Sequence, residues 1–512
     1  MAARKLKKFV RYGSVSADYM QKRQLRQGLG FWLLWGCGVG IVIDGIFAGW
    51  NEGLAYGGFW GMAIATALVA GMYMAITFSM AELAAALPHA GGFYAFTRTA
   101  FGPVGGFLCG IAEIFEYVVI NGWGLFYVGK FVHDVVGLPS LMLGPIDGTD
   151  VLLWIISTTV FTALIIYSTE LSLQINLWIA LIGVFMILLL VGGVLFTGKF
   201  DPQMLFTIAP NPEVSDASGF LPGGALGLLR AIPFAIWFYL AIEAMPIAAE
   251  EAKDAQRDLP KAMVAAMLTL VVLSVLVLVV NPGIALQVEE NGKILQGAAA
   301  LAISSEPMKQ GLDFVFGGEG FLHRVIEWAN AIATFTGAPA VVFAYSRVFF
   351  ALSRAGYLPQ WISVTTERGI PARAAIVGGV LSVLVTFVFV AAGGEESAIG
   401  NGLVTISVIG ALITYILLLA SYIKLRVDRA GMPRPYRSPV GVLGAFLGLV
   451  LATIAFIACF TLETYRLAVY GTVILFILAT VYFWFVGRQQ LVAEAPEEQL
   501  AGAGVDDTTV AL

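Results

Sequence analysis

Charged residues are scarce in this sequence. Asp, Glu, Lys and Arg together make up only 12% of its 512 residues, whereas 59% are hydrophobic and the mean hydropathy is +0.86. A soluble protein needs far more charge to cover its surface with polar groups. The composition therefore excludes a soluble globular domain and indicates a membrane protein.

Cysteine and histidine are also rare, with three residues of each type. All three cysteines lie in apolar stretches, so we expect no disulfide framework. The histidines are scattered, and no group of His, Cys, Asp and Glu has the spacing of metal ligands. Phosphate-binding glycine loops, nucleophile elbows and basic–aromatic patches for nucleic acid are missing too. We therefore expect no enzyme activity, no metal, no cofactor and no nucleic-acid partner.

Long apolar runs dominate the sequence, each near the roughly 20 residues that a helix needs to cross a lipid bilayer. They are continuous rather than alternating, which favours helices over the strands of a barrel. The expected fold class is an all-α membrane protein with about 12 transmembrane helices. The expected spans are 29–52, 57–86, 101–136, 150–167, 171–196, 226–249, 261–282, 321–352, 373–392, 398–425, 440–461 and 464–487.

Lysine and arginine gather on one side of these spans. If the N-terminus is cytoplasmic, 22 of the 29 lie on the cytoplasmic side, which is where such residues concentrate in membrane proteins. We therefore expect a multi-pass protein of the cell inner (plasma) membrane with both termini in the cytoplasm. Residues 1–28 would form a basic tail, and residues 488–512 an acidic, disordered one. In the outer connection 283–320, small residues 296–304 predict a short helix over the outer face, either a lid or an ordinary packed loop.

Two of the expected spans combine helix-weakening residues with an acid. In the first span, residues 35–50 contain five glycines and Asp44, and the sixth has Pro233 and Pro246 around Glu243. Glycine weakens helix continuity, and proline removes a helical hydrogen bond. Glycines alone would fit close packing between helices. Two broken spans set five apart are instead typical of transporters built from two inverted repeats, which bind substrate at the breaks.

This pattern divides the chain into two repeats of five helices. The first repeat would cover residues 29–196 and the second residues 226–425, with helices 1 and 6 broken. Two further helices would follow at 440–487. The odd number of helices in each repeat inverts the second copy across the membrane.

Four segments give the chain a family resemblance. They are AELAAALPHAGGFY (81–94), AEEAKDAQRDLP (249–260), SRVFFALSRAGYLP (346–359) and RPYRSP (434–439). In order and type they resemble the signatures of the amino acid–polyamine–organocation superfamily of permeases, over about residues 28–440.

Within that superfamily the chain looks most like the ethanolamine permeases. The segments that carry this likeness are 45–53, 234–243 with 248–253, and 352–359. The chain departs from the family's pattern at two positions. The family's acid in the first span is expected at Ile46, whereas this chain has Asp44. The family's proline-containing stretch in the third span is INGWG (120–124) here. The resemblance implies a secondary active transporter that imports a small organic amine, ethanolamine above all, by alternating access. The alternative is an amino acid or polyamine permease or exchanger.

Four acids are expected inside the membrane: Asp44, Glu113, Glu116 and Glu243. An ionised acid at a helix centre costs on the order of 2.5–3.5 kcal/mol, so such residues usually face a cavity, a partner or an ion pathway. Few cations lie inside the spans, and a cationic cargo would supply the missing charge. Asp44 would repel the carboxylate of an amino acid and attract an ammonium group.

We therefore expect Asp44 or Glu243 to pair with a primary amine among aromatic ring faces. Alternatively, Glu243 is a protonated structural group, Asp44 caps a half-helix, and the aromatic residues 237–239 are packing. Glu113 and Glu116, three positions apart on one helix face, fit a proton relay, a cargo contact or structural bonding equally. The expected substrate-binding residues are Asp44, Gly40, Gly45, Glu243, Trp237, Phe238, Tyr239, Glu116 and Asn121.

The coupling ion is left open between proton and sodium. Some relatives place a lysine in the fifth span instead of sodium, but residues 171–196 contain none. Thr334 and Thr336 are candidates for holding sodium, and Glu243 or Glu116 for carrying a proton. For the cytoplasmic helix ends we expect gate or structural salt bridges from Glu82, Glu250 and Glu251 to Arg98, Arg257 or Arg354. The expected coupling or gating residues are Glu113, Glu82, Thr334 and Thr336.

Overall fold

The computed structural model describes residues 10–143, 146–290, 292–317, 319–334, 337–394 and 398–500. Within these residues, 11 helices are long and apolar enough to cross a membrane, and a shorter apolar helical stretch covers Phe31–Phe47. The expected all-α class with about 12 spans is therefore confirmed. The division into two inverted repeats stays a prediction.

The spans follow one another along the chain with few intervening strands. The first is broken into α2 (Phe31–Val42) and α3 (Asp44–Phe47), and the sixth into α8 (Gly224–Ala235), η4 (Ile236–Phe238) and η5 (Ile242–Glu250). The others are α4 (Gly53–Ala86), α5 (Gly92–Val136), α6 (Gly148–Tyr167), α7 (Thr169–Thr197), α9 (Asp258–Val280), α12 (Gly320–Thr334) with α13 (Gly337–Arg354), α14 (Ala372–Ala391), α15 (Ala398–Asp428), α16 (Gly441–Cys459) and α17 (Arg466–Phe485).

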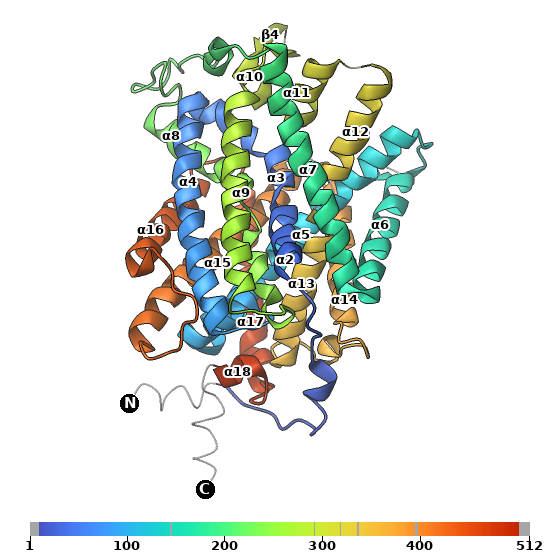
Figure 1. Cartoon of the computed structure of the whole chain (residues 1–512), viewed down its shortest axis with the longest axis vertical. Helices are drawn as coiled ribbons and strands as arrows, with labels where there is room; N and C mark the ends of the chain where they lie inside the picture. The colour runs from blue at the N-terminus through green and yellow to red at the C-terminus, as the bar shows by residue number, and fades with distance from the viewer. Residues whose placement is uncertain are drawn as a thin grey trace.

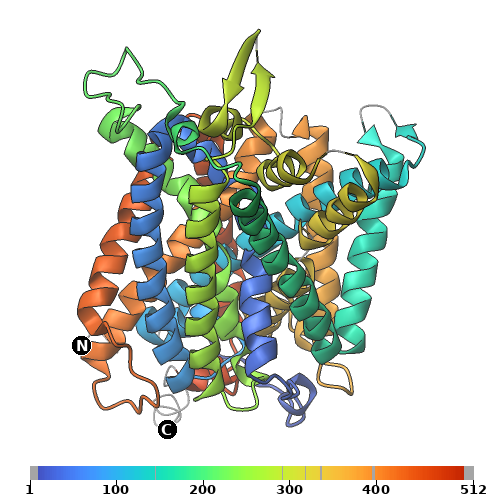
Figure 2. The same cartoon turned by 45° about the horizontal axis from the view of Figure 1, so that its top comes forward.

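The two ends of the helix bundle differ (Figure 1). The described N-terminal residues and α18 (Pro496–Leu500) lie at one end, called here the terminal face. The opposite end, called the loop face, carries the antiparallel hairpin of β3 (Gln287–Glu290) and β4 (Lys293–Gln296), followed by α10 (Gly297–Ala302) and α11 (Pro307–Phe316). The hairpin projects from this face (Figure 2). The short helix predicted from residues 296–304 is thus present as α10.

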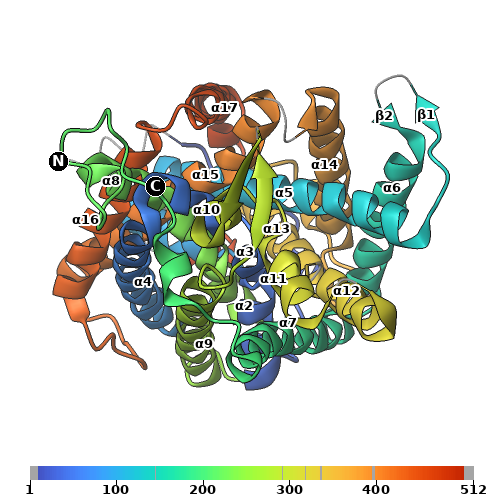
Figure 3. The same ribbon diagram turned by 90° about the horizontal axis from the view of Figure 1, so that it is seen from above.

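Seen from above, the broken first span lies inside the bundle, and α6 and α16 lie at opposite edges (Figure 3). The edge helices expose large apolar side chains, for example Ile155 and Val160 on α6 and Leu443 and Phe446 on α16. Such side chains suit contact with lipid, where polar groups would be costly. The helices at the edge therefore face the bilayer, whereas residues 45–47 of α3 are buried.

The two breaks pack directly against each other. A Cβ built on Gly45 would lie 2.0 Å from the carbonyl oxygen of Trp237, and one on Gly49 would lie 3.1 Å from the Trp237 ring. Gly49 also has a φ of 93°, and on the other segment Ala241 has a φ of 77°, in the left-handed region that disfavours side chains. Glycine at position 45 is therefore required by the close approach of the two backbones.

The C-terminal tail is folded as far as it is described. The short helix η8 (Gly487–Gln489) and α18 turn back under the bundle, and the side chains of Glu497 and Glu498 are fully buried. The N-terminal segment joins it, because the amide of Gly13 donates a hydrogen bond of 2.8 Å to the carbonyl of Leu491. The expected disorder is therefore wrong for residues 488–500, because composition does not reveal that these acids pair with buried arginines. Residues 501–512, like residues 1–9, lie outside the described part.

Replacing Gly45 by alanine tests the contact between the two breaks. We expect Gly45→Ala to lower the thermal unfolding temperature of the detergent-solubilised protein, because overpacking against a backbone oxygen typically costs about 1–3 kcal/mol. Gly71→Ala is the matched control, since a Cβ on that glycine would meet nothing within 4 Å. Equal unfolding temperatures for the two variants would contradict the packing described here.

Candidate functional site

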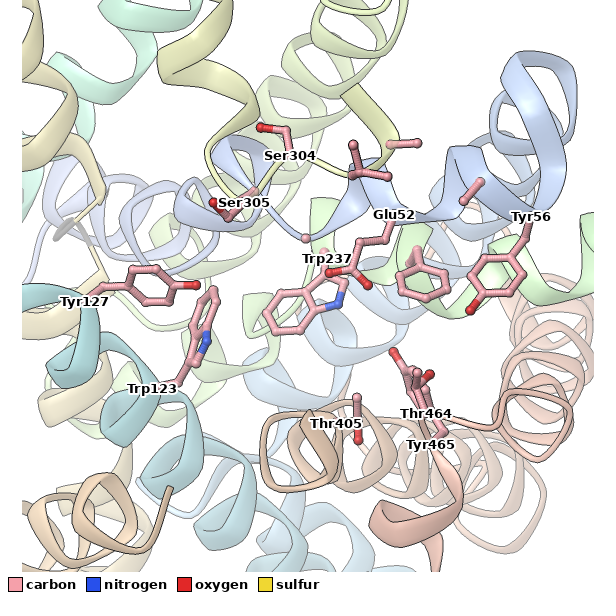
Figure 4. A pocket seen from close by; sticks show the side chains of 16 residues that line it. Glu52, Tyr56, Trp123, Tyr127, Trp237, Ser304, Ser305, Thr405, Thr464 and Tyr465 are labelled. Atoms are coloured by element: carbon pink, nitrogen blue, oxygen red, sulfur yellow. The ribbon is translucent and has the colours of Figure 1, made fainter. Parts of the chain in front are cut away.

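A cavity of about 440 Å³ lies between the two breaks and the loop face. Residues 302–305, at and after the end of α10, line its outer side, and Trp237 of η4 lies near its centre (Figure 4). We call this cavity the vestibule. Its lining residues are Ala48, Gly49, Glu52, Ala55, Tyr56, Trp123, Tyr127, Phe234, Trp237, Ala302, Ile303, Ser304, Ser305, Thr405, Thr464 and Tyr465.

The vestibule combines one acid with several aromatic rings. The carboxylate of Glu52 is directed toward the Trp237 indole, while Trp123 and Tyr127 approach from α5 on the other side (Figure 4). The ring centroids of Trp123 and Trp237 are 5.4 Å apart. Aromatic faces beside a carboxylate attract cations. Glu52 was not predicted as a site residue, although it is an acid eight positions after Asp44, in the short helix η2 (Trp50–Glu52) beyond the break.

A smaller cavity of about 60 Å³ extends from the vestibule toward Asp44. The two cavities share Ala48, Trp123, Tyr127 and Ser305. The Oδ1 atom of Asp44, which is half-buried, accepts a hydrogen bond of 2.8 Å from the amide of Gly45. Asp44 therefore binds a backbone amide at the break, as a cap would, and still lines the cavity.

A cation lines this smaller cavity together with Asp44. The ammonium of Lys309, on α11, lies 3.6 Å from Glu306 and 3.9 Å from Glu327. The sequence placed Lys309 on the outer side but did not indicate that it would reach the break. The cavity therefore has a positive as well as a negative group on its wall.

Glu243 lies apart from both cavities and is fully buried. The hydroxyl of Tyr415 donates to its Oε1 atom at 2.8 Å, and the hydroxyl of Tyr73 donates to Tyr415 at 2.9 Å. The Glu116 carboxyl is a near neighbour of that of Glu243, and among the described residues neither Glu116 oxygen has a hydrogen-bond donor. Two ionised acids this close in a buried site would repel each other, which favours a proton on one of them. The structure thus brings Glu116 and Glu243 together and separates both from Asp44.

The predicted aromatic residues point in three directions. Trp237 lines the vestibule, whereas Phe238 stacks on Trp50 with ring centroids 5.1 Å apart. The hydroxyl of Tyr239 shares a hydrogen bond of 2.7 Å with that of Ser274. Only the first of the three is therefore placed where a molecule in the vestibule could touch it.

Three further predicted residues lie in helix packing or outside the cavities. Gly40 faces Asn176, since a Cβ on it would lie 2.4 Å from the Asn176 side-chain nitrogen. Asn121 and Glu113 are buried on α5 and are not among the residues that line either cavity. Thr336 and the side chain of Thr334 lie outside the described residues.

The terminal side of the breaks is closed by ion pairs. Arg354 donates to Glu250 at 3.1 Å, as one of the sequence-derived pairings proposed, while Glu251 pairs with Arg347 at 2.8 Å. The gating candidate Glu82 pairs with Arg426 at 2.6 Å and with Arg434 at 2.8 Å, rather than with the arginines expected. The vestibule therefore adjoins the loop face, while buried charges join the helices at the terminal face.

Comparison with known proteins adds the family. Residues 31–486 match the sequence pattern described as amino acid permease. The chain is 26% identical over 456 residues to an uncharacterised transporter of Rhizobium meliloti (strain 1021), covering 88% of this chain and 90% of the relative. It is 24% identical over 432 residues to the branched-chain amino acid permease BcaP of Bacillus subtilis (strain 168), covering 82% and 85%. The methylthioribose transporter of the same organism is 26% identical over 340 residues, covering 63% and 66%.

The family match spans the broken helices, the vestibule and the ion pairs of the terminal face alike. A bundle of apolar helices with two breaks around a polar cavity is the arrangement that carries solutes through a membrane. The chain belongs to the amino acid permease family and is a multi-pass membrane transporter.

Proposed function

We propose that the protein is a secondary active transporter that imports a small organic amine, with ethanolamine as the preferred cargo. The observation that carries this proposal is the position of the Asp44 carboxylate, on the wall of the smaller cavity at the break. Alternating access would expose this site first to the loop face and then to the terminal face. The amine would enter through the vestibule.

One backbone amide favours an amine over an amino acid as cargo. A free amide at a helix break favours an anion, and an amino acid would offer its carboxylate there. The Gly45 amide already donates to Asp44. A second carboxylate would lose this donor and be repelled by Asp44, whereas an ammonium would be attracted by it. A cargo with an amine and no acid fits these groups better than a zwitterion.

The vestibule supports the same charge preference. Glu52 and the rings of Trp123 and Trp237 offer a cation both a negative charge and aromatic faces. Each such contact contributes about 0.5–2 kcal/mol, depending on how far water is excluded. A positively charged cargo would therefore be held before it reaches Asp44.

An amino acid is the second candidate cargo, because one observation favours it. Lys309 lines the same small cavity as Asp44, and its ammonium would pair with a cargo carboxylate while Asp44 held the amine. One relative is named as a branched-chain amino acid permease and another as a methylthioribose transporter. The names of relatives thus do not select one cargo.

For the coupling ion we propose a proton carried by the pair of Glu116 and Glu243. The two acids are near neighbours in a fully buried site, and Tyr415 donates a hydrogen bond to Glu243. Loss of the proton would leave two like charges side by side in a site of low polarity, which is strongly unfavourable. Glu243 lies at the start of η5 and Glu116 on α5, so protonation of the pair would act on the inner half of the broken sixth span.

The terminal face is proposed to lie in the cytoplasm of a cell with this protein in its inner membrane. The support is the distribution of the 29 lysines and arginines, of which 22 lie on that side of the spans. Positive residues concentrate on the cytoplasmic side of membrane proteins.

Thermal unfolding with added solutes tests the cargo. We expect ethanolamine to raise the unfolding temperature of the detergent-solubilised protein, since a ligand at 100 times its Kd stabilises the native state by about 2.7 kcal/mol. Asp44→Asn should abolish this rise, while Glu213→Gln, an exposed acid on the loop after α7, should preserve it. Stabilisation by a neutral amino acid, with none by ethanolamine, would contradict the amine assignment and favour the second candidate.

Uptake of radiolabelled ethanolamine into proteoliposomes tests the coupling. An inward proton gradient should accelerate uptake by the wild type, and Glu116→Gln and Glu243→Gln should remove at least about 90% of this acceleration, because neither retains a shared proton to exchange. Glu367→Gln, an exposed acid after η6 (Gln360–Ser363), is the control. Acceleration by a sodium gradient instead of a proton gradient would show that the assignment is wrong.

A further inference from the structure

The described end of the tail presents two consecutive acids to the interior of the terminal face. The amide of Val492 donates to the carbonyl of Ala355 at 3.0 Å, which fixes the tail beside the end of α13. Beyond it, α18 directs Glu497 and Glu498 inward, and neither side chain is exposed. Acids are almost never buried without partners.

Glu498 is held by one arginine and two tyrosines. The Nε atom of Arg98, on α5, donates to its Oε1 atom at 2.8 Å, and the hydroxyl of Tyr357 donates to the same oxygen at 2.9 Å. The hydroxyl of Tyr12, from the N-terminal segment, donates to Oε2 at 2.9 Å. Within the described residues, the hydrogen bonds of the Arg98 guanidinium go to Glu498 and Tyr12. Arg98 therefore depends on the tails for its partners.

Glu497 is held by Arg354 and His89. The Nε atom of Arg354 donates to its Oε1 atom at 2.9 Å, and the Nε2 atom of His89 lies 3.1 Å from the same oxygen. The amide of Gly91 donates to Nδ1 of His89 at 2.8 Å, so the ring proton belongs on Nε2, facing the acid. Burial by itself would raise the pKa of Glu497, but the charge of Arg354 and the hydrogen bond from His89 outweigh it and hold that pKa below its usual value. Glu497 is therefore bound as a carboxylate.

These bonds connect the tail to the broken sixth span. Arg354 binds Glu497 and also Glu250, the last residue of η5, at 3.1 Å. A chain of charges thus runs from the tail through α13 to the inner half of the broken sixth span. Removing one member of a buried ion pair leaves an uncompensated charge, which is strongly unfavourable. While both acids are in place, separation of α5, α13 and η5 at the terminal face is opposed.

We propose that Arg98, Arg354 and His89 form a carboxylate-binding site in the terminal face, that its ligand is the pair Glu497–Glu498 of the protein's own tail, and that its occupancy keeps this face closed. Release of the two acids is then a condition for opening. The inference rests on the alternating access proposed above. The site binds carboxylates and is separate from the vestibule, so it does not depend on which cargo the protein carries.

A cysteine already present reports the opening. Cys109 on α5 is fully buried, and its thiol lies beside Thr97, the neighbour of Arg98. We expect N-ethylmaleimide to modify Cys109 about tenfold faster or more in Glu497→Gln/Glu498→Gln than in the wild type. A tenfold change in the labelling rate corresponds to about 1.4 kcal/mol. This is less than the cost of leaving one member of a buried ion pair without its partner. Peptide-resolved mass spectrometry of the labelled protein measures the rate at each cysteine, and Cys459 on α16 serves as the internal control.

Two truncations and a peptide separate tail binding from general unfolding. Ending the chain after Leu500 should leave Cys109 protected, whereas ending it after Gln490 should expose it. A synthetic peptide of residues 491–500 should restore protection to the shorter chain, and the same peptide with both acids changed to glutamine should not. Glu494→Gln, an exposed acid of the same segment, should label like the wild type.

Equal rates at Cys109 in wild type and Glu497→Gln/Glu498→Gln would overturn the proposal, as would an equal rise at Cys459, which would indicate unfolding rather than opening. Failure of the intact peptide to protect the shorter chain would overturn the assignment of the ligand. None of these measurements uses a transported solute, so an error in the amine assignment would leave their outcome unchanged.

Discussion

The contact between the two broken spans is the constraint on which the site depends. At Gly45 the first span approaches the backbone of Trp237 so closely that a single methyl group would lie 2.0 Å from its carbonyl oxygen. Since the first span is interrupted at Ile43 and the sixth at residues 239–241, amides and carbonyls that a continuous helix would use internally are available to other groups. The vestibule, the position of Asp44 and the turn that carries Trp237 all follow from this contact.

The acids of the protein fall into three layers along the bundle, and each layer has a different environment. Asp44 and Glu52 border cavities near the loop face. Glu116 and Glu243 are buried beyond the break and lie close to each other. At the terminal face, Glu250, Glu251 and the tail acids are matched by arginines. In the functions proposed above, cargo attraction, proton binding and closure would therefore involve separate groups.

The ion pairs at the terminal face also give a physical role to the N-terminal segment and the C-terminal tail, which look dispensable in the sequence. Tyr12 from the N-terminal segment and Glu498 from the tail meet at Arg98, an arginine that is almost fully buried. A buried guanidinium without a partner would be costly. The tail is thus part of the closed state of the terminal face rather than an appendage.

The sequence by itself determined the membrane class, the spans and the two breaks, because hydropathy, glycine and proline act locally along the chain. It also identified Asp44, Trp237, Glu116 and Glu243 as residues of interest. Only the tertiary structure decided that Trp237 lines the vestibule while Tyr239 does not, that Glu52 and Lys309 reach the cavities, and that Glu497 and Glu498 are buried rather than disordered. These outcomes depend on contacts between side chains of helices that are far apart in the sequence. The spacing of residues along one helix carries no information about such contacts.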